Sequence, residues 1–561
     1  MRAPRIPASA LLAITGALVL APGLLAAEIV LTDPDYDAIN ANGLDQPRLY
    51  FLLSDPAQGD AVITWENPAS GATEPVLLTA FIDTGASGFA LSHLHISGDY
   101  EQPVIGLSPD QPGDFLGPFT EIGIGGPEVG DVSRPLGVWV RNGAVGASEE
   151  ILVSDFINFG DFSLWTRRET GAAEVVDFLG FPIVSPLNLV GMPVIRQRRL
   201  LLDVTPMSTL TALGLPDPLE TALLASGAPE PLTQATIPLV LRDFIGNAPP
   251  AGEVLPSHYA NPLVPGLTLH GTGGASASGE WLLDTGAGAS FASFATARAA
   301  GLVPAHYATL AEFMADYTGP TVEIGGIGAS QTVPRLTAPR ITVATREGAT
   351  LAWKNVELLI ADVAGLDGIF GMNLLVPSIT LDPADPLGSL AEISPSTIRT
   401  VVIDTTDAAD PVMRLGTSAA DGTVFAWLGE NFSAAERSLP NVGALAADPD
   451  TDGFSNLLEY ALGLDPRVAD SASAAPQASA PLIGDARYLA LSFSRPAVGR
   501  PDVNYAVEIS NDLATWRRDT GEVVAHSAQT IGERETLTLR TAAPLAPGGR
   551  VFLRLHVSLT N

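Results

Sequence analysis

Two aspartates, each at the start of an Asp-Thr-Gly triplet, are the residues of this chain best suited to chemistry. They are Asp83 and Asp284, and each follows an apolar, strand-like run. Two carboxyls held roughly 3 Å apart cannot both ionise, so one of them keeps a proton. Such a pair acts as base and acid around a single water. The two triplets therefore predict acid–base hydrolysis, provided that folding brings their loops together.

The residues that follow each aspartate suit a shared loop structure. Gly85 and Gly286 allow backbone N–H groups to approach the carboxylates closely. Thr84 and Thr285 carry hydroxyls that are able to lock two such loops together. A third triplet, Asp519–Gly521, follows two arginines and no apolar strand, so we interpret it as an ordinary turn. The prediction therefore rests on the residues around a triplet and not on the triplet alone.

Both triplets belong to an internal repeat that covers residues 28 to about 398. Each is followed by Glu-Ile-Gly, then by two apolar residues with Gly-Met, and then by an apolar run that ends in Asp. These landmarks are Glu121–Gly123, Leu189–Met192 and Leu200–Asp203 in the first copy, and Glu323–Gly325, Ile369–Met372 and Ile379–Asp382 in the second. Short apolar or β-branched segments between Gly and Pro predict strands in both copies. The elements that must position the aspartates are therefore two similar β lobes, joined near Ala225–Pro229.

These residues resemble the motifs of the aspartic proteases of the pepsin and retropepsin type. The resemblance covers roughly residues 45–395 and implies that Asp83 and Asp284 form a catalytic dyad. It implies that an apolar-apolar-Gly strand backs each loop, that a polypeptide substrate lies between the lobes, and that catalysis needs no cofactor. The residues that would support the dyad are Thr84, Gly85, Thr285 and Gly286.

The chain departs from the pepsin pattern at two places. Ala86 and Ala287 follow the triplets, as in retropepsins, where pepsin-like enzymes have Ser or Thr. The missing hydroxyl would stabilise the ionised dyad, so we expect a less acidic pH optimum than that of pepsin. The tyrosine of the pepsin flap is also missing, and Gly-rich stretches resemble retropepsin flaps instead. The flap candidates are Ile122, Gly123, Ile324 and Gly325.

A second motif, Asp448–Glu459, matches the calcium-loop pattern D-x-D-x-D-G-x₅-E at every fixed position. Calcium prefers about six to eight oxygen ligands, and Gly453 would make the sharp turn. The motif resembles Asp-rich loops of secreted bacterial proteins, which implies a structural Ca²⁺; the alternative is an acidic, solvated turn at a domain joint. The expected ligands are Asp448, Asp450, Asp452, the carbonyl of Phe454, Asn456 and Glu459.

Other catalytic signatures are missing from the sequence. His93 and His95 alternate along what we predict to be one strand face, with no third metal ligand nearby, so we expect a surface pair. The chain has no H-E-x-x-H, no G-x-S-x-G and no phosphate-binding loop. It has no cysteine, which excludes a thiol nucleophile and disulfides.

Composition limits the partners and the location of the protein. The 561 residues carry a formal net charge of −33, which disfavours nucleic acid and anionic membranes as partners. Arg2, Arg5 and the apolar run Leu11–Leu20 predict a signal peptide at residues 1–27. No other segment reaches about 18 uninterrupted apolar residues, so we expect no stable membrane span after its removal. We therefore expect a monomer that is secreted, periplasmic or on the cell surface of a bacterium.

The sequence as a whole predicts an all-β protein. Its expected parts are a signal peptide at 1–27, aspartic protease lobes at 28–228 and 229–398, a linker with an EF-hand-like calcium loop at 399–468, and a β-sandwich accessory domain at 480–561. The lobes would form a pepsin/retropepsin-like double barrel, followed by a short helical calcium-binding segment. The expected function is that of a secreted aspartic endopeptidase. The alternative is a non-catalytic secreted binding protein that uses the interlobe cleft and the C-terminal β domain.

Overall fold

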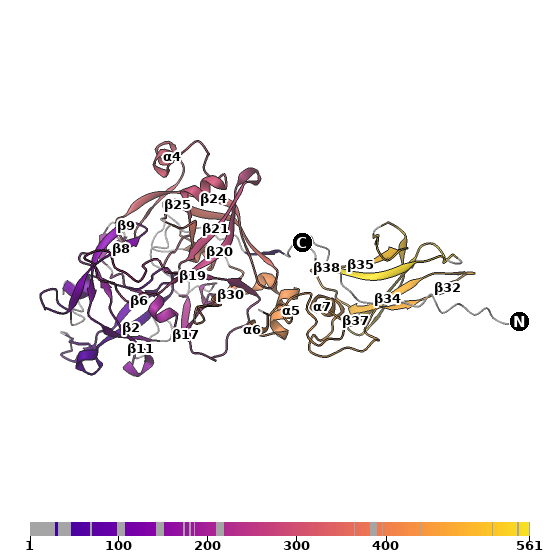
Figure 1. Cartoon of the computed structure of the whole chain (residues 1–561), viewed down its shortest axis with the longest axis horizontal. Helices are drawn as coiled ribbons and strands as arrows, with labels where there is room; N and C mark the ends of the chain where they lie inside the picture. The colour runs from indigo at the N-terminus through magenta and orange to yellow at the C-terminus, as the bar shows by residue number, and fades with distance from the viewer. Residues whose placement is uncertain are drawn as a thin grey trace. The chain divides into compact units, whose positions relative to one another are not determined.

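The computed structural model describes the chain from residue 28 to residue 559, with several gaps (Figure 1). The described residues are 28–31, 46–67, 70–97, 107–141, 151–171, 174–178, 181–184, 186–208, 218–363, 365–381, 390–394, 396–437, 439–518, 520–546 and 549–559. They are mostly β, with one closed barrel of six strands and a half-barrel, which confirms the predicted all-β class at this level. The predicted signal peptide, Asp382 and Asp519 lie outside the described residues.

The chain divides into two compact units. One contains Ile29–Thr345 and Thr350–Ala419, and the other consists mainly of Ala420–Asn561. Both copies of the sequence repeat fall in the first unit, and the calcium-loop motif falls in the second. No helix in the described part of the chain has the length and hydropathy needed to cross a lipid bilayer.

The first copy of the repeat forms one large sheet. Asp83 follows the strand β6, which lies between β2 and β15 inside this sheet, and the residues of β6 alternate between buried and more exposed positions on its two faces. The strand order is β11 (Phe156–Phe162), β10 (Leu136–Arg141), β2 (Arg48–Asp55), β6 (Leu78–Ile82), β15 (Leu189–Val190), β7 (Phe89–Leu91), β12 (Trp165–Thr166), β9 (Gly126–Ser133) and β8 (Phe115–Gly123). Shorter pieces are β3 (Ala61–Val62), β4 (Thr64–Glu66), β5 (Thr73–Pro75), β13 (Val175–Phe178), β14 (Phe181–Val184), α1 (Leu94–Ser97) and α2 (Met192–Ile195).

The second copy forms a corresponding sheet, in which Asp284 follows β21. Its strand order is β1 (Glu28–Val30), β25 (Thr350–Ala361), β22 (Phe291–Ser293), β26 (Gly368–Phe370), β21 (Ser276–Leu283), β20 (Asn261–His270), β24 (Gln331–Ala344) and β23 (Thr321–Ile324). Around this sheet lie β19 (Val240–Arg242), which pairs with β20, the hairpin of β27 (Ser378–Leu381) and β28 (Leu390–Ser394), and the helices α3 (Phe294–Ala299) and α4 (Leu310–Asp316).

A third sheet joins segments that are far apart in the sequence. It runs in the order β17 (Glu220–Leu224), β16 (Arg199–Asp203), β29 (Ile398–Asp404), β30 (Val412–Thr417) and β18 (Ala235–Pro238). The residues of β29 and β30 lie after the boundary that the sequence placed at 398. The compact unit therefore ends at Ala419, because these two strands pair with β16 and β18.

The second unit packs a short helical region onto β-strands. Its helices are α5 (Val424–Asn431), α6 (Ala434–Arg437) and α7 (Asn456–Leu462), and α7 lies where the sequence predicts a helix after the acidic loop. Phe454 and Leu462 share a buried cluster with Phe493 and Val507, so the acidic loop and α7 belong to the core of the β domain. The strands are β31 (Gln477–Ser479), β32 (Leu482–Ile483), β33 (Ala486–Arg487), β34 (Ala490–Pro496), β35 (Val503–Ser510), β36 (Val523–Ile531), β37 (Arg534–Thr541) and β38 (Phe552–Leu559).

Candidate active site and cation site

Each candidate catalytic aspartate accepts hydrogen bonds from the backbone of its own loop. The N–H groups of Gly85 and Ala86 donate to Oδ1 of Asp83 over 2.7 and 3.2 Å. The N–H groups of Gly286 and Ala287 donate to Oδ1 of Asp284 in the same way, over 2.9 and 3.0 Å. In each loop one carboxylate oxygen is thus fixed by main-chain donors.

The apolar-apolar-Gly strands lie directly beside these loops. β15 runs parallel to β6 and β26 runs parallel to β21. The N–H of Asp83 donates to Val190 O and that of Asp284 donates to Phe370 O, each over 3.0 Å. A Cβ at Gly191 would lie 2.3 Å from the carbonyl oxygen of Ala86, so glycine is needed where the backing strand meets the loop.

Two buried threonines join the loops to each other across the repeat. Thr84 Oγ1 donates to Leu283 O over 2.6 Å and accepts the N–H of Thr285 over 3.1 Å. Thr285 Oγ1 donates to Ile82 O over 2.6 Å and accepts the N–H of Thr84 over 3.1 Å. Both side chains are fully buried, so these four hydrogen bonds hold the loops together with no competition from solvent.

The joined loops place each carboxyl against the glycine of the opposite loop. A Cβ on Gly85 would lie 2.4 Å from the carboxyl carbon of Asp284, and a Cβ on Gly286 would lie 2.5 Å from that of Asp83. Burial raises the pKa of Asp83, while burial and the charge of Asp83 raise the pKa of Asp284 well above its ordinary value. The pair therefore retains one proton at pH values where an isolated aspartate would be ionised.

Two amide side chains that the sequence did not single out also cross between the copies. Gln46 Nε2 donates to Gly286 O, and Asn261 Nδ2 donates to Thr84 O over 2.9 Å. Each amide residue precedes a proline, at Pro47 and Pro262. Because Asn67 and Gln111 also precede prolines, this local pattern did not distinguish Gln46 and Asn261 before folding.

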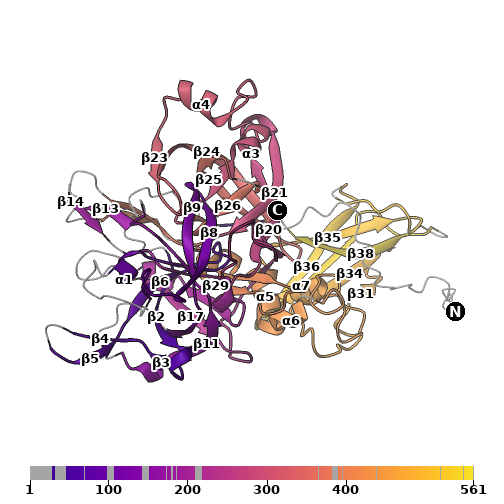
Figure 2. The same cartoon turned by 60° about the vertical axis from the view of Figure 1, so that its left-hand side comes forward.

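The flap candidates lie on two hairpins that meet at their tips. Ile122 and Gly123 belong to the hairpin of β8 and β9, which Figure 2 shows as a long antiparallel pair, and Ile324 ends β23. The N–H of Gly125 donates to Ile327 O over 3.1 Å, and the N–H of Ala329 donates to Gly125 O over 3.0 Å. Each hairpin thus binds the tip of the other through its backbone; the candidate Gly325 lies between β23 and this contact.

A buried arginine of the first copy strengthens this contact between the hairpins. Arg167 donates to Gly326 O over 2.9 Å and lies 3.2 Å from a carboxylate oxygen of Glu128. The other carboxylate oxygen of Glu128 accepts the N–H of Gly328 over 2.9 Å. Glu174, which is fully buried, lies 3.5 Å from the same guanidinium.

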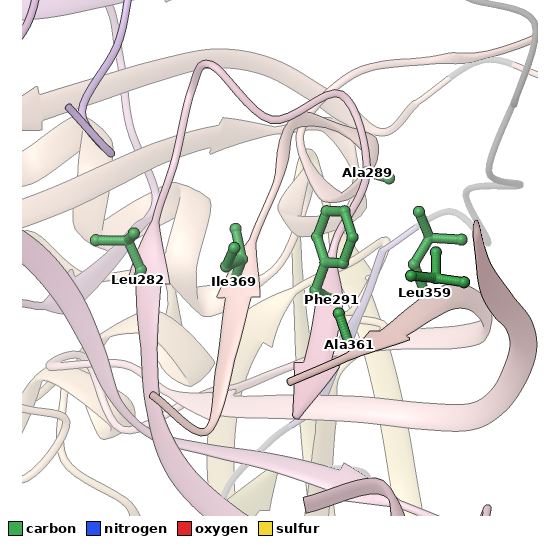
Figure 3. Close-up of a cluster of buried hydrophobic side chains, with 7 residues drawn as sticks. Leu282, Ala289, Phe291, Leu359, Ala361 and Ile369 are labelled. Atoms are coloured by element: carbon green, nitrogen blue, oxygen red, sulfur yellow. The ribbon is translucent and has the colours of Figure 1, made fainter. Parts of the chain in front are cut away.

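An apolar cluster lies beside the dyad loop of the second copy. Leu282 is two residues before Asp284, and it packs with Phe291 and Ile369 from adjacent strands. Figure 3 shows these side chains projecting from one face of the sheet, together with Leu359 and Ala361. Ile124, from the tip of the first hairpin, packs against this cluster.

The calcium-loop motif folds into a tight acidic turn. Asp448 accepts the N–H groups of Asp452 and Gly453, over 3.2 and 2.9 Å, and Asp452 accepts the N–H of Phe454 over 2.8 Å. Gly453 takes the left-handed conformation expected for the turn (φ 97°). The carboxylates of Asp448, Asp450 and Asp452 offer oxygens that all lie within 4.8 Å of one another.

Glu459 and Asp470 complete this acidic group from the other side. Asp452, Glu459 and Asp470 again offer oxygens within 4.8 Å of one another. Glu459 is 0% exposed, and neither of its carboxylate oxygens has a hydrogen-bond partner among the described residues. Burial and the neighbouring aspartates raise the pKa of Glu459 to about 8. Buried, unpartnered carboxylates of this kind fit a divalent cation, which prefers oxygen ligands.

Two expected ligands of the motif, Asn456 and Phe454, also contact residues outside it. Asn456 donates through Nδ2 to Val442 O and Ala444 O, and its Oδ1 has no hydrogen-bond partner in the described part of the chain. Phe454 packs its ring into the core of the unit, while its position in the turn follows the predicted pattern. Asp470 was missed because it lies outside the twelve-residue motif, and only the fold brings it to Glu459.

The interpretation of His93 and His95 as a surface pair is wrong. His95 lies in α1, is 4% exposed, and has Nε2 3.1 Å from Nδ2 of Asn188. Burial lowers the pKa of His95 to about 4. The alternation of the two histidines predicts a strand, whereas the chain forms the short helix α1, which buries His95.

Comparison with known proteins adds no assignment: no family model matches the chain, and no curated protein is significantly similar to it.

Proposed function

We propose that this protein is an aspartic-type endopeptidase with two lobes that correspond to the two copies of the repeat. One observation carries the proposal: Thr84 and Thr285 join the two loops symmetrically, so that the carboxyl of each aspartate lies against the glycine of the opposite loop. A buried carboxyl pair with one proton has the two groups that hydrolysis of an amide requires, a base and an acid.

The proposed reaction follows from that single proton. The ionised carboxylate takes a proton from water while the water oxygen bonds to the peptide carbonyl carbon. The protonated carboxyl gives its proton to the carbonyl oxygen. The newly protonated carboxyl then gives its proton to the amide nitrogen, and the other carboxylate takes a proton from a hydroxyl of the tetrahedral diol as the C–N bond breaks; this releases an acid and an amine and restores the shared proton. The backbone N–H groups of Gly85 and Gly286 keep each carboxylate oriented during these steps.

The test is cleavage of an unfolded protein between pH 3 and pH 7 by the wild type, Asp83→Asn and Asp284→Asn. We expect cleavage by the wild type and a loss of at least about a thousandfold in both variants, since each removes one of the two proton-transfer groups. Equal activity in all three proteins, or no cleavage by the wild type at any pH, would exclude the dyad mechanism. In the second case the non-catalytic binding protein becomes the better description.

We also propose that the acidic loop of the second unit binds a structural Ca²⁺. The proposed ligands include Asp448, Asp450, Asp452 and Glu459, and Asp470 is added to them; the carbonyl of Phe454 and the side chain of Asn456 complete the set that the motif predicts. The support is the fully buried Glu459, whose two oxygens have no partner in the described residues.

Calorimetric titration of the purified chain with Ca²⁺ tests this site. We expect one binding event that Asp470→Asn weakens by at least about tenfold, because one charged ligand is lost. Asp485→Asn, an exposed aspartate of the same unit, is the matched control and should bind as the wild type does. Binding that is absent, or unaffected by Asp470→Asn, would contradict the proposal.

The cellular setting remains part of the proposal. The signal-like N-terminus and the net charge of −33 favour export from a bacterial cell and a polypeptide substrate, and they argue against nucleic acid as a partner. We propose a monomer that needs no cofactor for catalysis. Comparison of the N-terminal residue of the protein from culture medium with Met1 tests the export.

A further inference from the structure

The strand β36 (Val523–Ile531) lies at one end of the four-stranded sheet of the second unit. It pairs with β37 on one side, and on its other side no strand or loop among the described residues forms a hydrogen bond with it. The strand at the opposite end of the same sheet, β31, has three residues, whereas β36 has nine. In the described part of the chain, the sheet therefore ends in a long strand with an uncovered edge.

The geometry of the hairpin formed by β36 and β37 shows which main-chain groups point outward from this edge. The two-residue turn Gly532–Glu533 joins the strands, so Ile531 and Arg534 form a hydrogen-bonded pair. Hydrogen-bonded and non-hydrogen-bonded pairs alternate along an antiparallel ladder. Ala528 and Thr530 thus occupy non-hydrogen-bonded positions, and their N–H and C=O groups point away from β37. A further strand is able to pair with these groups.

The side chains of β36 leave this edge open as well. Every residue from Ala525 to Ile531 is exposed, on both faces of the strand, so no other layer of the unit covers it. The strand contains no Lys, Arg, Asp, Glu or Pro, which are the residues that commonly prevent pairing at edge strands. A bulge between Ala525 and Ser527 shifts the register, and the strand is regular from Ser527 onward. These features are typical of a strand that accepts a partner.

The edge of the first-copy sheet is covered, in contrast to that of β36. This sheet ends at β8, and the N–H of Val254 donates to Pro118 O of β8 over 2.9 Å. The carboxylate of Glu253 accepts both the hydroxyl of Thr120, over 2.6 Å, and its N–H, over 3.3 Å. The outward groups of β8 thus have partners from the chain itself, so an uncovered edge is not a general property of these sheets.

The charge around β36 differs from that of the whole chain. Residues 480–561 contain nine Arg and no Lys, against eight Asp and Glu, which gives a formal net charge of +1, whereas the whole chain carries −33. A second copy would bring its own acidic surface, and repulsion between two such chains opposes the pairing of β36 with itself. An uncharged segment of another polypeptide meets no such repulsion. The charge distribution therefore favours an extended, uncharged polypeptide as the partner.

We propose that β36 captures extended, uncharged segments of unfolded polypeptides, which add a further strand to the sheet of the second unit. The main-chain groups of Ala528 and Thr530 bond with the main chain of the captured segment, and such bonds provide affinity with little dependence on sequence. The inference goes beyond the proposed peptidase function, because it does not depend on the dyad. Unfolded polypeptide is also the substrate class of the proposed peptidase, so one chain would both hold and cleave it.

Binding of a labelled peptide to the full chain tests the proposal. The probe is a fluorescein-labelled decapeptide of alternating Thr and Val with a short polyethylene glycol tail, and Asp83→Asn in the protein keeps the probe intact. Fluorescence anisotropy should show saturable binding that Ala528→Pro weakens by about tenfold, because proline removes one outward N–H and no bond to β37. The matched control is Gln529→Ala, which changes an exposed side chain on the same strand and should bind as the parent protein does.

Hydrogen exchange with mass spectrometry locates the bound peptide without any change to β36. Addition of the peptide should slow the exchange of amides within Val523–Ile531 by about tenfold, because outward N–H groups become hydrogen-bonded. A peptide of the same length with two central prolines should give no such protection, since it cannot pair along the strand. This measurement still decides the matter if Ala528→Pro fails to fold.

Three results would overturn the inference. The first is the absence of peptide binding. The second is binding that leaves the exchange of Val523–Ile531 unchanged. The third is a dimer of the full chain, detected by light scattering, that protects these amides in the absence of peptide, which would assign the edge to a second copy. Neither binding measurement uses cleavage, so a wild type that cleaves nothing would remove the proposed peptidase function while binding still decides the role of β36.

Discussion

The hydroxyls of Thr84 and Thr285 each form hydrogen bonds with the backbone of the opposite copy. These bonds fix where Asp83 and Asp284 lie. Each hydroxyl donates to a carbonyl before the opposite aspartate and accepts an N–H after it. Because the pattern is reciprocal, loss of one hydroxyl leaves unpaired groups in both loops. The positions of the two carboxyls therefore depend on the hydrogen bonds of Thr84 and Thr285.

Thr84→Val should lower the free energy of unfolding of the first unit by about 2–4 kcal/mol. The variant keeps the volume of the side chain but leaves Leu283 O and the N–H of Thr285 without partners in a buried site. Urea unfolding measures the change. Thr79→Val, at an exposed position on β6, the strand that precedes the loop, is the matched control and should change stability by less than about 0.5 kcal/mol.

The activity of the dyad should follow a bell-shaped pH profile on the acidic side of neutrality. The pKa values of Asp83 and Asp284 are raised, so the shared proton is retained as pH rises through the ordinary range of aspartate and is lost only at higher pH. Activity should fall at high pH when this proton leaves and at low pH when both carboxyls are protonated. A profile of kcat/KM against pH that stays flat from pH 3 to pH 8 would be inconsistent with this pair.

At the scale of elements, the hairpin of β8 and β9 contacts the hairpin of β23 and β24 at the tips. Their backbones are bonded between Gly125 and residues 327–329, and Arg167 with Glu128 adds charged contacts from the first copy only. The two hairpins are therefore joined by backbone hydrogen bonds and by charged contacts.

Glu128→Gln should loosen the second hairpin. The buried guanidinium of Arg167 loses a charged partner, and the acceptor of the Gly328 N–H becomes weaker, so amides at 326–329 should exchange with solvent about tenfold faster. Hydrogen exchange with mass spectrometry reports this. Asp131→Asn removes the exposed pair with the adjacent Arg168 and should leave the exchange unchanged, since surface ion pairs contribute little.

At the scale of the molecule, the two compact units have separate sources of stability. The first has two large sheets and a third sheet that connects the copies, whereas the second has a small core that includes the residues around α7. Phe454, within the acidic loop, and Leu462, at the end of α7, pack in that core. A cation at the loop would therefore stabilise the whole second unit.

Chelation of calcium should lower the melting temperature of the second unit alone. A ligand present at about 100 times its Kd adds about 2.7 kcal/mol, which corresponds to roughly 10 °C for a unit of this size. Differential scanning calorimetry with EDTA and with Ca²⁺ should show one transition that moves and one that stays. Equal shifts of both transitions, or no shift, would contradict a structural cation in the acidic loop.

The sequence by itself determined the local features of this protein. The all-β class, the two Asp-Thr-Gly loops with their backing strands, and the helix after the acidic turn follow from short-range patterns of apolar residues, glycines and turn residues. Such patterns act within a few residues, so one chain segment is enough to read them. Gln46 and Asn261 lie at different distances before their aspartates in the sequence, so the repeat did not single out their amides.

Only the tertiary structure decided which distant groups meet. Asp470 joins Glu459, Arg167 reaches the second hairpin, and β29 and β30 extend the first unit beyond residue 398. His95 is buried where alternation predicted exposure, and Ile245, Val254 and Leu255 pack against the first-copy cluster around Trp165. These outcomes depend on packing and hydrogen bonds between segments far apart in the chain, and no local pattern encodes which segments those are.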